Sequence, residues 1–216
     1  MGSLADTILI IVVLLNLALL GTGRLRPSIR LVAAQGMILG LLPLLVSEHG
    51  AGLRLALLAV ATVALKGVAF PKLLYRSLRS SNAKHEIDPV VGVTASVPLG
   101  LLLLAGSFWM ASRFQLPAGV EVASNLVLPV ALATILCGLF LIITRLQALN
   151  QVLGYLVLEN GIFVFGVALA HEEPFLVETG VLLDVFVGVF VMGIAIFHIS
   201  RTFDHIDVKQ LSRLKD

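Results

Sequence analysis

Residues 123–144 read ASNLVLPVALATILCGLFLIIT, a stretch without one charged side chain. A helix rises about 1.5 Å per residue, so a run of this length covers the roughly 30 Å hydrocarbon core of a bilayer. Strands are excluded because the run is long and does not alternate, and because an open sheet edge cannot face lipid. The stretch therefore predicts a transmembrane helix.

Six further apolar runs have the same character and are separated by short polar segments rich in Gly, Pro and charge. The predicted spans are 4–22, 29–47, 54–75, 90–111, 123–144, 148–170 and 175–198. Prolines inside the spans are expected to kink helices, which membrane bundles tolerate; they are Pro43, Pro71, Pro98 and Pro129. The fold class predicted is an all-α membrane protein with about seven transmembrane helices.

The composition agrees with a multi-pass membrane protein. Of 216 residues, 58% are hydrophobic and 13% are charged, and the mean hydropathy is +1.04. A soluble domain carries roughly 25% charged residues, so an ordinary soluble globule, a disordered chain and a nucleic-acid binder are excluded. The lone Cys137 cannot form an intrachain disulfide and is interpreted as a packing residue. Metal-ligand and nucleotide-loop motifs are absent from the sequence, and we expect no cofactor and no metal.

The basic residues predict the orientation in the membrane. Twelve of the fifteen Lys and Arg residues fall on one side: Arg24, Arg26, Arg30, Lys72, Arg76, Arg79, Lys84, Arg145, Arg201, Lys209, Arg213 and Lys215. Only Arg54 and Arg113 fall on the other side. The positive-inside rule then places the N-terminus outside, the C-terminus in the cytoplasm and residues 199–216 in a cytoplasmic tail. The expected location is the plasma (inner) membrane.

Three ionisable residues, Lys66, Glu159 and Asp184, fall near the middle of their predicted spans. Each costs a few kcal/mol at the bilayer centre on insertion scales, so each requires a reason to be there. Desolvation makes a carboxyl group harder to ionise and a nearby cation makes it easier, and a carboxyl that takes either charge state suits a proton relay. The alternative interpretation is structural, with the charges locking helices together.

Other polar residues are candidates for a supporting role in the same path: Asn160, Gln35, Arg145 and His198. Gln35 is expected to donate a hydrogen bond between helices. Small residues flank the two acids, with Gly154 and Gly161 near Glu159 and with Gly180 and Gly188 one turn to either side of Asp184. Because small residues let helices approach closely, both acids are expected to face neighbouring protein rather than lipid.

The order of the charges suggests an internal repeat within one membrane domain, 1–216. Arg26 precedes Lys66 by 40 positions and Arg145 precedes Asp184 by 39. Residues 4–75 and 123–198 would then be two parallel three-helix units, with 90–111 as a connector. Superposition of the two units tests this hypothesis.

Several short motifs resemble known membrane subunits. Arg145 with residues 154–160, GYLVLEN, is similar to the second helix of the K subunit of respiratory complex I. Residues 184–188, DVFVG, resemble the E-x-x-x-G of its third helix, and 206–208, IDV, resemble its ending. The full layout, with LENG at 158–161 and Lys66 upstream of Pro71, resembles hydrogenase-4 component E.

The resemblance implies a subunit of an energy-converting hydrogenase or formate hydrogenlyase-type assembly, itself non-catalytic and without a redox centre. Its partners would be antiporter-like and other membrane subunits of that oxidoreductase complex. Asp184 matches the second membrane acid of the K subunit, whereas Leu156 occupies the position of the first and Glu159 lies three residues later. The proton-path role of Glu159 is therefore inferred. The alternatives are a subunit of a multisubunit cation/proton antiporter and a purely structural subunit.

Overall fold

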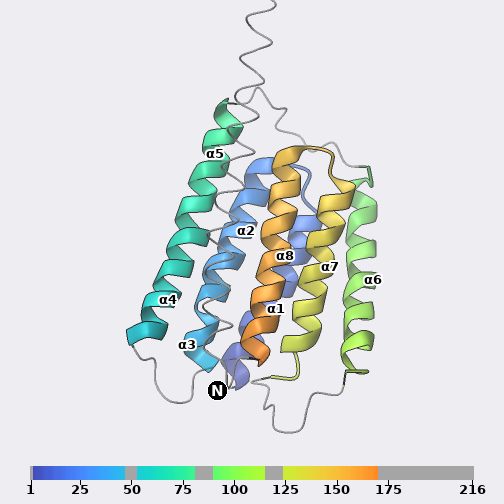
Figure 1. Cartoon of the computed structure of the whole chain (residues 1–216). Coiled ribbons are helices and arrows are strands. Elements are labelled where there is room, and N and C mark those ends of the chain that lie inside the picture. The colour runs from blue at the N-terminus through green and yellow to red at the C-terminus, as the bar shows by residue number, and fades with distance from the viewer. Residues whose placement is uncertain (1, 47–52, 81–89, 115–123, 170–216) are drawn as a thin grey trace, which may run out of the picture.

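A computed structural model describes residues 2–46, 53–80, 90–114 and 124–169. These residues fold into a bundle of helices (Figure 1), and their regular elements are all helical apart from isolated bridge residues. The elements, in chain order, are α1 Gly2–Leu20, α2 Leu25–Gly40, α3 Leu42–Val46, α4 Leu53–Ala64, the π-helical turn η1 Leu65–Ala69, α5 Phe70–Ser80, α6 Val93–Ala111, α7 Val127–Thr144 and α8 Ala148–Leu169.

The all-helical prediction is confirmed for this part of the chain. Each of the first six predicted spans coincides with a helix or with helices that follow directly on one another. Among the described residues, three helical segments are long and apolar enough to cross a membrane: Leu25–Leu45, Val93–Ala111 and Val127–Thr144. The predicted seventh span, 175–198, lies outside the described residues. The total of seven spans and the sidedness of the termini stay predictions.

The helices run up and down, so that their ends meet at two ends of the bundle (Figure 1). The end of α1, the start of α2, the end of α5 and the α7–α8 connection lie at the same end. Two hydrogen bonds support this grouping, from Val90 N–H to the Thr144 carbonyl at 2.8 Å and from Tyr75 Oη to the Arg26 carbonyl at 3.4 Å. Within the described residues, several basic residues predicted to share one side of the membrane belong to these segments: Arg24, Arg26, Arg76, Arg79 and Arg145.

α7 and α8 pack closely against each other, and this contact depends on glycine. A Cβ atom on Gly161 would lie 2.6 Å from the Ile135 backbone nitrogen. A Cβ atom on Gly138 would overlap the Leu158 backbone of the facing helix. Close approach of backbones through small residues is the usual way in which membrane helices associate. The expectation that Gly154 and Gly161 serve close packing is confirmed, because Gly154 also faces the α7 backbone at Ile142.

The two edges of the bundle expose apolar side chains. α4 lies at one edge and α6 at the other (Figure 1). Leu53 on α4 is 78% exposed, and Leu102 and Trp109 on α6 are 68% and 65% exposed. Large apolar surfaces of this kind are unfavourable in water but suit a lipid environment or a partner subunit.

The prolines within the predicted spans have different effects. The helix is interrupted next to Pro43, since α2 ends at Gly40 and α3 begins at Leu42. Pro98 lies inside α6, where the helix continues. The expectation of a kink within the helix was wrong for Pro129, which lies in the first turn of α7. The backbone N–H groups of a first turn have no partner within the helix, so the N–H that proline lacks is not needed there.

Pro71 follows directly on a wider turn of helix. In η1 the backbone N–H of Phe70 donates to the Leu65 carbonyl, five residues back, which is the π-helical pattern. In a regular α-helix the ring of Pro71 would clash with the carbonyl four residues earlier. The wider turn accommodates the proline, and it carries Lys66 into the interior.

Candidate functional site

A buried ion pair joins η1 to α8. The Lys66 Nζ lies 2.7 Å from Glu159 Oε1, and the two side chains are 4% and 3% exposed. The structure thus confirms that Glu159 faces protein rather than the outer surface of the bundle, and it places Lys66 there as well. Asp184, the other acid expected to face protein, lies outside the described residues. Two opposite charges at this distance compensate part of the large penalty for burying either one alone.

Lys66 also contacts two other side chains of α8. The side-chain oxygen of Asn160 accepts a second hydrogen bond from Lys66 Nζ, at 2.9 Å. The ammonium group lies 5.1 Å from the centre of the Phe163 ring, within the range of a cation–π interaction. Glu159, Asn160 and Phe163 therefore present a carboxylate, an amide oxygen and the face of a ring to one cation.

Glycine on α2 makes room for the lysine. A Cβ atom on Gly36 would lie 2.6 Å from the Cβ of Lys66, closer than real side chains approach. The aliphatic stem of Lys66 therefore passes directly against the α2 backbone on its way to α8. Any larger residue at position 36 must displace this stem.

A row of polar side chains continues from Asn160 across the bundle. Asn160 Nδ2 donates to Gln35 Oε1 on α2 at 3.4 Å, and Gln35 Nε2 donates to Asn16 Oδ1 on α1 at 2.9 Å. Asn16 Nδ2 then donates to Thr134 Oγ1 on α7, also at 2.9 Å. All of these side chains are buried. The expectation that Gln35 is an interhelical donor is confirmed.

The remaining predicted residues lie elsewhere. Arg145 caps the end of α7, is 1% exposed and donates from Nη2 to the Leu20 carbonyl at 3.4 Å. Its Nε and Nη1 have no hydrogen-bond partner among the described residues, and burial lowers the pKa of its guanidinium. Arg145 is thus a buried cation separate from the Lys66 site. Asp184 and His198 lie outside the described residues, and their roles stay predictions.

Sequence reasoning missed Asn16, Thr134 and Phe163. Asn16 could have been found by the argument that identified Gln35, because an amide in an apolar span needs a hydrogen-bond partner. Thr134 gave a weaker signal, since a threonine hydroxyl can bond to the carbonyl of its own helix, as Thr134 does to Val130 at 2.7 Å. The contact of Phe163 depends on which helices meet.

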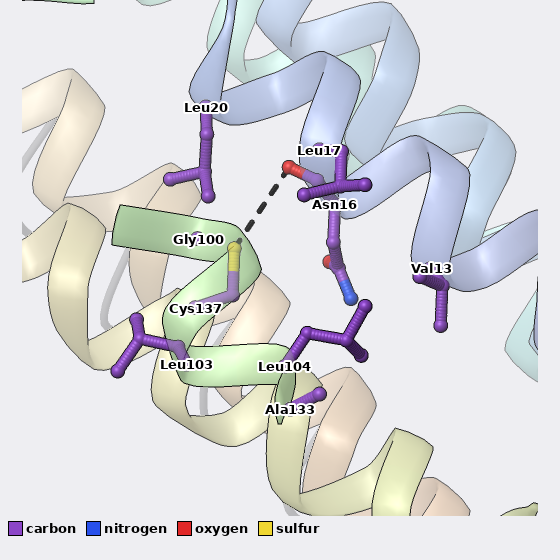
Figure 2. A pocket seen from close by; sticks show the side chains of 9 residues that line it. All are labelled: Val13, Asn16, Leu17, Leu20, Gly100, Leu103, Leu104, Ala133 and Cys137. Atoms are coloured by element: carbon purple, nitrogen blue, oxygen red, sulfur yellow. Dashed lines mark hydrogen bonds between the residues drawn. The ribbon is translucent and has the colours of Figure 1, made fainter. Parts of the chain in front are cut away.

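A small pocket lies beside Asn16, between α1, α6 and α7 (Figure 2). Its lining is mostly apolar, and Cys137 contacts the Asn16 carbonyl there with an Sγ–O distance of 3.9 Å. Cys137 is buried among packed helices, as the sequence suggested. The described part of the chain contains no group of three or more His, Cys, Asp or Glu residues that could hold a metal.

Comparison with curated proteins finds two kinds of relative. Over 198 residues the chain is 33% identical to a protein named "Uncharacterized protein Rv0085" from Mycobacterium tuberculosis (strain ATCC 25618 / H37Rv), which covers 89% of this chain and 87% of the relative. Over 121 residues it is 35% identical to "Hydrogenase-4 component E" of Escherichia coli (strain K12), which covers 55% of this chain and 56% of that protein. The protein of the same name from Shigella flexneri matches to the same extent.

No family model matches the chain, and no solved structure matches it significantly. The match to hydrogenase-4 component E covers little more than half of either protein. The match to the mycobacterial protein covers most of both. The chain therefore belongs to the same protein family as Rv0085 of Mycobacterium tuberculosis.

Proposed function

We propose that this protein is a non-catalytic membrane subunit of a hydrogenase-type complex and that Lys66 and Glu159 form part of its proton path. The 2.7 Å ion pair in the interior of the helical bundle carries this proposal. The similarity to hydrogenase-4 component E supports the assignment to a hydrogenase-type assembly. Electrons would travel in other subunits, and the membrane partners would include antiporter-like subunits.

The pair has the chemistry that a relay requires. While Glu159 is a carboxylate, the pair with the Lys66 ammonium is neutral overall. When a proton arrives, a new O–H bond on Glu159 gives the pair one positive charge. Loss of that proton toward the other side of the membrane breaks the bond and restores the neutral pair. Asp184 is the proposed second acid of this path.

Membership of the complex is tested by purification from the native host. A tagged copy of the full chain should retain the nickel-iron hydrogenase subunits and antiporter-like subunits through detergent extraction. The matched control is a tagged membrane protein of similar size from the same host. Retention of neither subunit type by the tagged chain, with the complex intact in the same extract, would contradict the assignment.

Replacement of Lys66 tests its part in the path. Lys66→Met removes the cation, whereas Lys66→Arg keeps a positive charge. We expect hydrogen-dependent proton uptake by inverted membrane vesicles to fall at least tenfold in Lys66→Met and to be partly retained in Lys66→Arg, with hydrogen oxidation continuing in both. Equal proton uptake in both variants and in the unaltered complex would show that Lys66 is outside the path.

A further inference from the structure

The hydrogen bonds that run from Lys66 across the bundle all donate in the same direction. Lys66 donates to Asn160, Asn160 to Gln35, Gln35 to Asn16 and Asn16 to Thr134. Thr134 donates in turn to the Val130 carbonyl. This row of hydrogen bonds connects η1, α8, α2, α1 and α7. Helices that are distant in sequence therefore share one polar row through an apolar interior.

The two ends of this hydrogen-bonded row fix the direction in which its members donate. A lysine ammonium has only donors, so Asn160 must turn its oxygen toward Lys66. At the other end, the Thr134 hydroxyl hydrogen is used on the Val130 carbonyl, so Thr134 Oγ1 accepts from the NH₂ group of Asn16. Each amide between these ends then has one arrangement in which every bond is made: oxygen toward Lys66 and NH₂ toward Thr134.

We infer that Thr134, Asn16, Gln35 and Asn160 are positioning residues that hold the Lys66 side chain against Glu159, so that the Glu159 carboxylate gains and releases the proton beside a fixed hydrogen-bond donor. This inference rests on the proposed proton-path function. Donor chains of this kind polarise one another, and the oxygen ends of three amides point along the row toward the charge. Phe163 and Glu159 add two further groups that favour a cation at the same nitrogen.

The longest hydrogen bond of the row lies between Asn160 and Gln35. Asn160 and Gln35 are separated by 3.4 Å, whereas the neighbouring links measure 2.9 Å. Gln35 makes two of the links, and neither is to Lys66 or Glu159. A change at Gln35 or at Thr134 therefore tests the row without removing a contact of the ion pair itself.

The experiment uses the full chain in lipid vesicles and follows the protonated-carboxyl band of Glu159 by infrared spectroscopy across a pH series. Glu159→Gln identifies the band. Thr134→Val removes the hydroxyl at nearly constant volume, Thr134→Ser keeps it, and Gln35→Met breaks the row in the middle. Thr144→Val is the matched control, because Thr144 makes the same bond to its own helix, at 2.6 Å to Phe140, at the far end of α7.

At a pH where the unaltered chain shows a weak band, we expect the band to rise about twofold or more in Thr134→Val and further in Gln35→Met. Thr134→Ser and Thr144→Val should match the unaltered chain. Should Thr134→Val fail to insert, Thr134→Ala tests the same link. An unchanged band in Thr134→Val, an equal change in Thr144→Val or the absence of any Glu159 band overturns the inference.

This readout is independent of the hydrogenase complex. A band that responds to the row while Glu159→Gln leaves proton uptake by the complex intact would refute the proposed function and leave the positioning role standing. If the band does not change in the row variants while proton uptake depends on Glu159, the positioning role is refuted and the proposed function stands.

Discussion

Lys66 and Glu159 lie 93 positions apart in sequence, and their side chains meet at 2.7 Å in the interior of the bundle. Each alone would be an uncompensated charge in a low-dielectric environment. Together with Asn160 and Phe163 they form a site with matched charge and polarity. The site links the π-helical turn that precedes Pro71 to α8, which packs closely on α7 through glycine.

Removing one member of the ion pair should destabilise the protein more than removing both. Lys66→Met or Glu159→Leu alone leaves a buried charge and should lower the free energy of unfolding by about 3–5 kcal/mol. The double variant should lose less stability than either single variant, because it leaves no unpaired buried charge. Thermal unfolding in detergent, analysed as a double-mutant cycle, measures the difference.

The control for that cycle is Arg113, whose guanidinium lies over the exposed Trp109 ring at 5.4 Å. Arg113→Gln should change stability by less than about 0.5 kcal/mol. A strong coupling energy with unimpaired proton uptake in the single variants would favour the purely structural interpretation. Additive single effects would show that the pair contributes no coupling at all.

The α7–α8 contact should be intolerant of any side chain at Gly138. Gly138→Ala places a methyl group against the Leu158 backbone, and the helices must separate to admit it. We expect a loss of about 1–3 kcal/mol, the usual effect of overpacking. Gly106→Ala on α6 is the control, because no atom lies within 4 Å of an added Cβ there. Loss of stability in both variants alike would contradict the packing explanation, because alanine has the higher helix propensity and should not destabilise an unobstructed helical position.

Gly36→Ala should displace Lys66 without changing any charge. The added methyl group would lie against the Lys66 Cβ, and the lysine stem has to move to avoid it. We expect proton uptake by the complex to fall several-fold while assembly continues. Gly166→Ala on α8, where an added Cβ meets nothing within 4 Å, should leave uptake unchanged. Equal uptake in the two variants would show that the position of the lysine stem does not matter.

Replacing Arg145 should not lower the stability of the isolated chain. Its Nε and Nη1 make no hydrogen bond among the described residues, and its burial disfavours the charged form. Arg145→Met keeps much of the volume and removes the charge, so we expect equal or higher stability, by up to about 3 kcal/mol. Thermal unfolding of the two chains in detergent checks this. A large loss of stability in Arg145→Met would contradict this prediction.

The sequence predicted the helices well because an apolar run of about 20 residues has few alternatives in a membrane. It also identified Lys66 and Glu159 as charges near the middle of their spans and Gln35 as an interhelical donor, since polar groups in such runs require partners. It did not predict which helices meet, and so it left open whether Lys66 pairs within the chain. Thr134 and Phe163 were missed because their roles depend on those contacts, whereas Asn16, an amide in an apolar span, could have been identified by the argument used for Gln35.

Some predictions stay open for a different reason. Asp184 and His198 lie outside the described residues, and so does the third helix of the second proposed repeat unit. The similarity of residues 123–198 to the complex I K subunit and the parallel repeat therefore remain hypotheses. The proton-path roles of the site residues are proposals that variants in the assembled complex must test.

The most direct test of the central claim is hydrogen-driven proton uptake by inverted vesicles that carry the complex with Glu159→Gln, beside Glu159→Asp and the unaltered protein. The account predicts that Glu159→Gln oxidises hydrogen but loses at least nine-tenths of its proton uptake, and that Glu159→Asp keeps part of it. Full proton uptake in Glu159→Gln, with the subunit present in the complex, would contradict the claim that this ion pair carries protons.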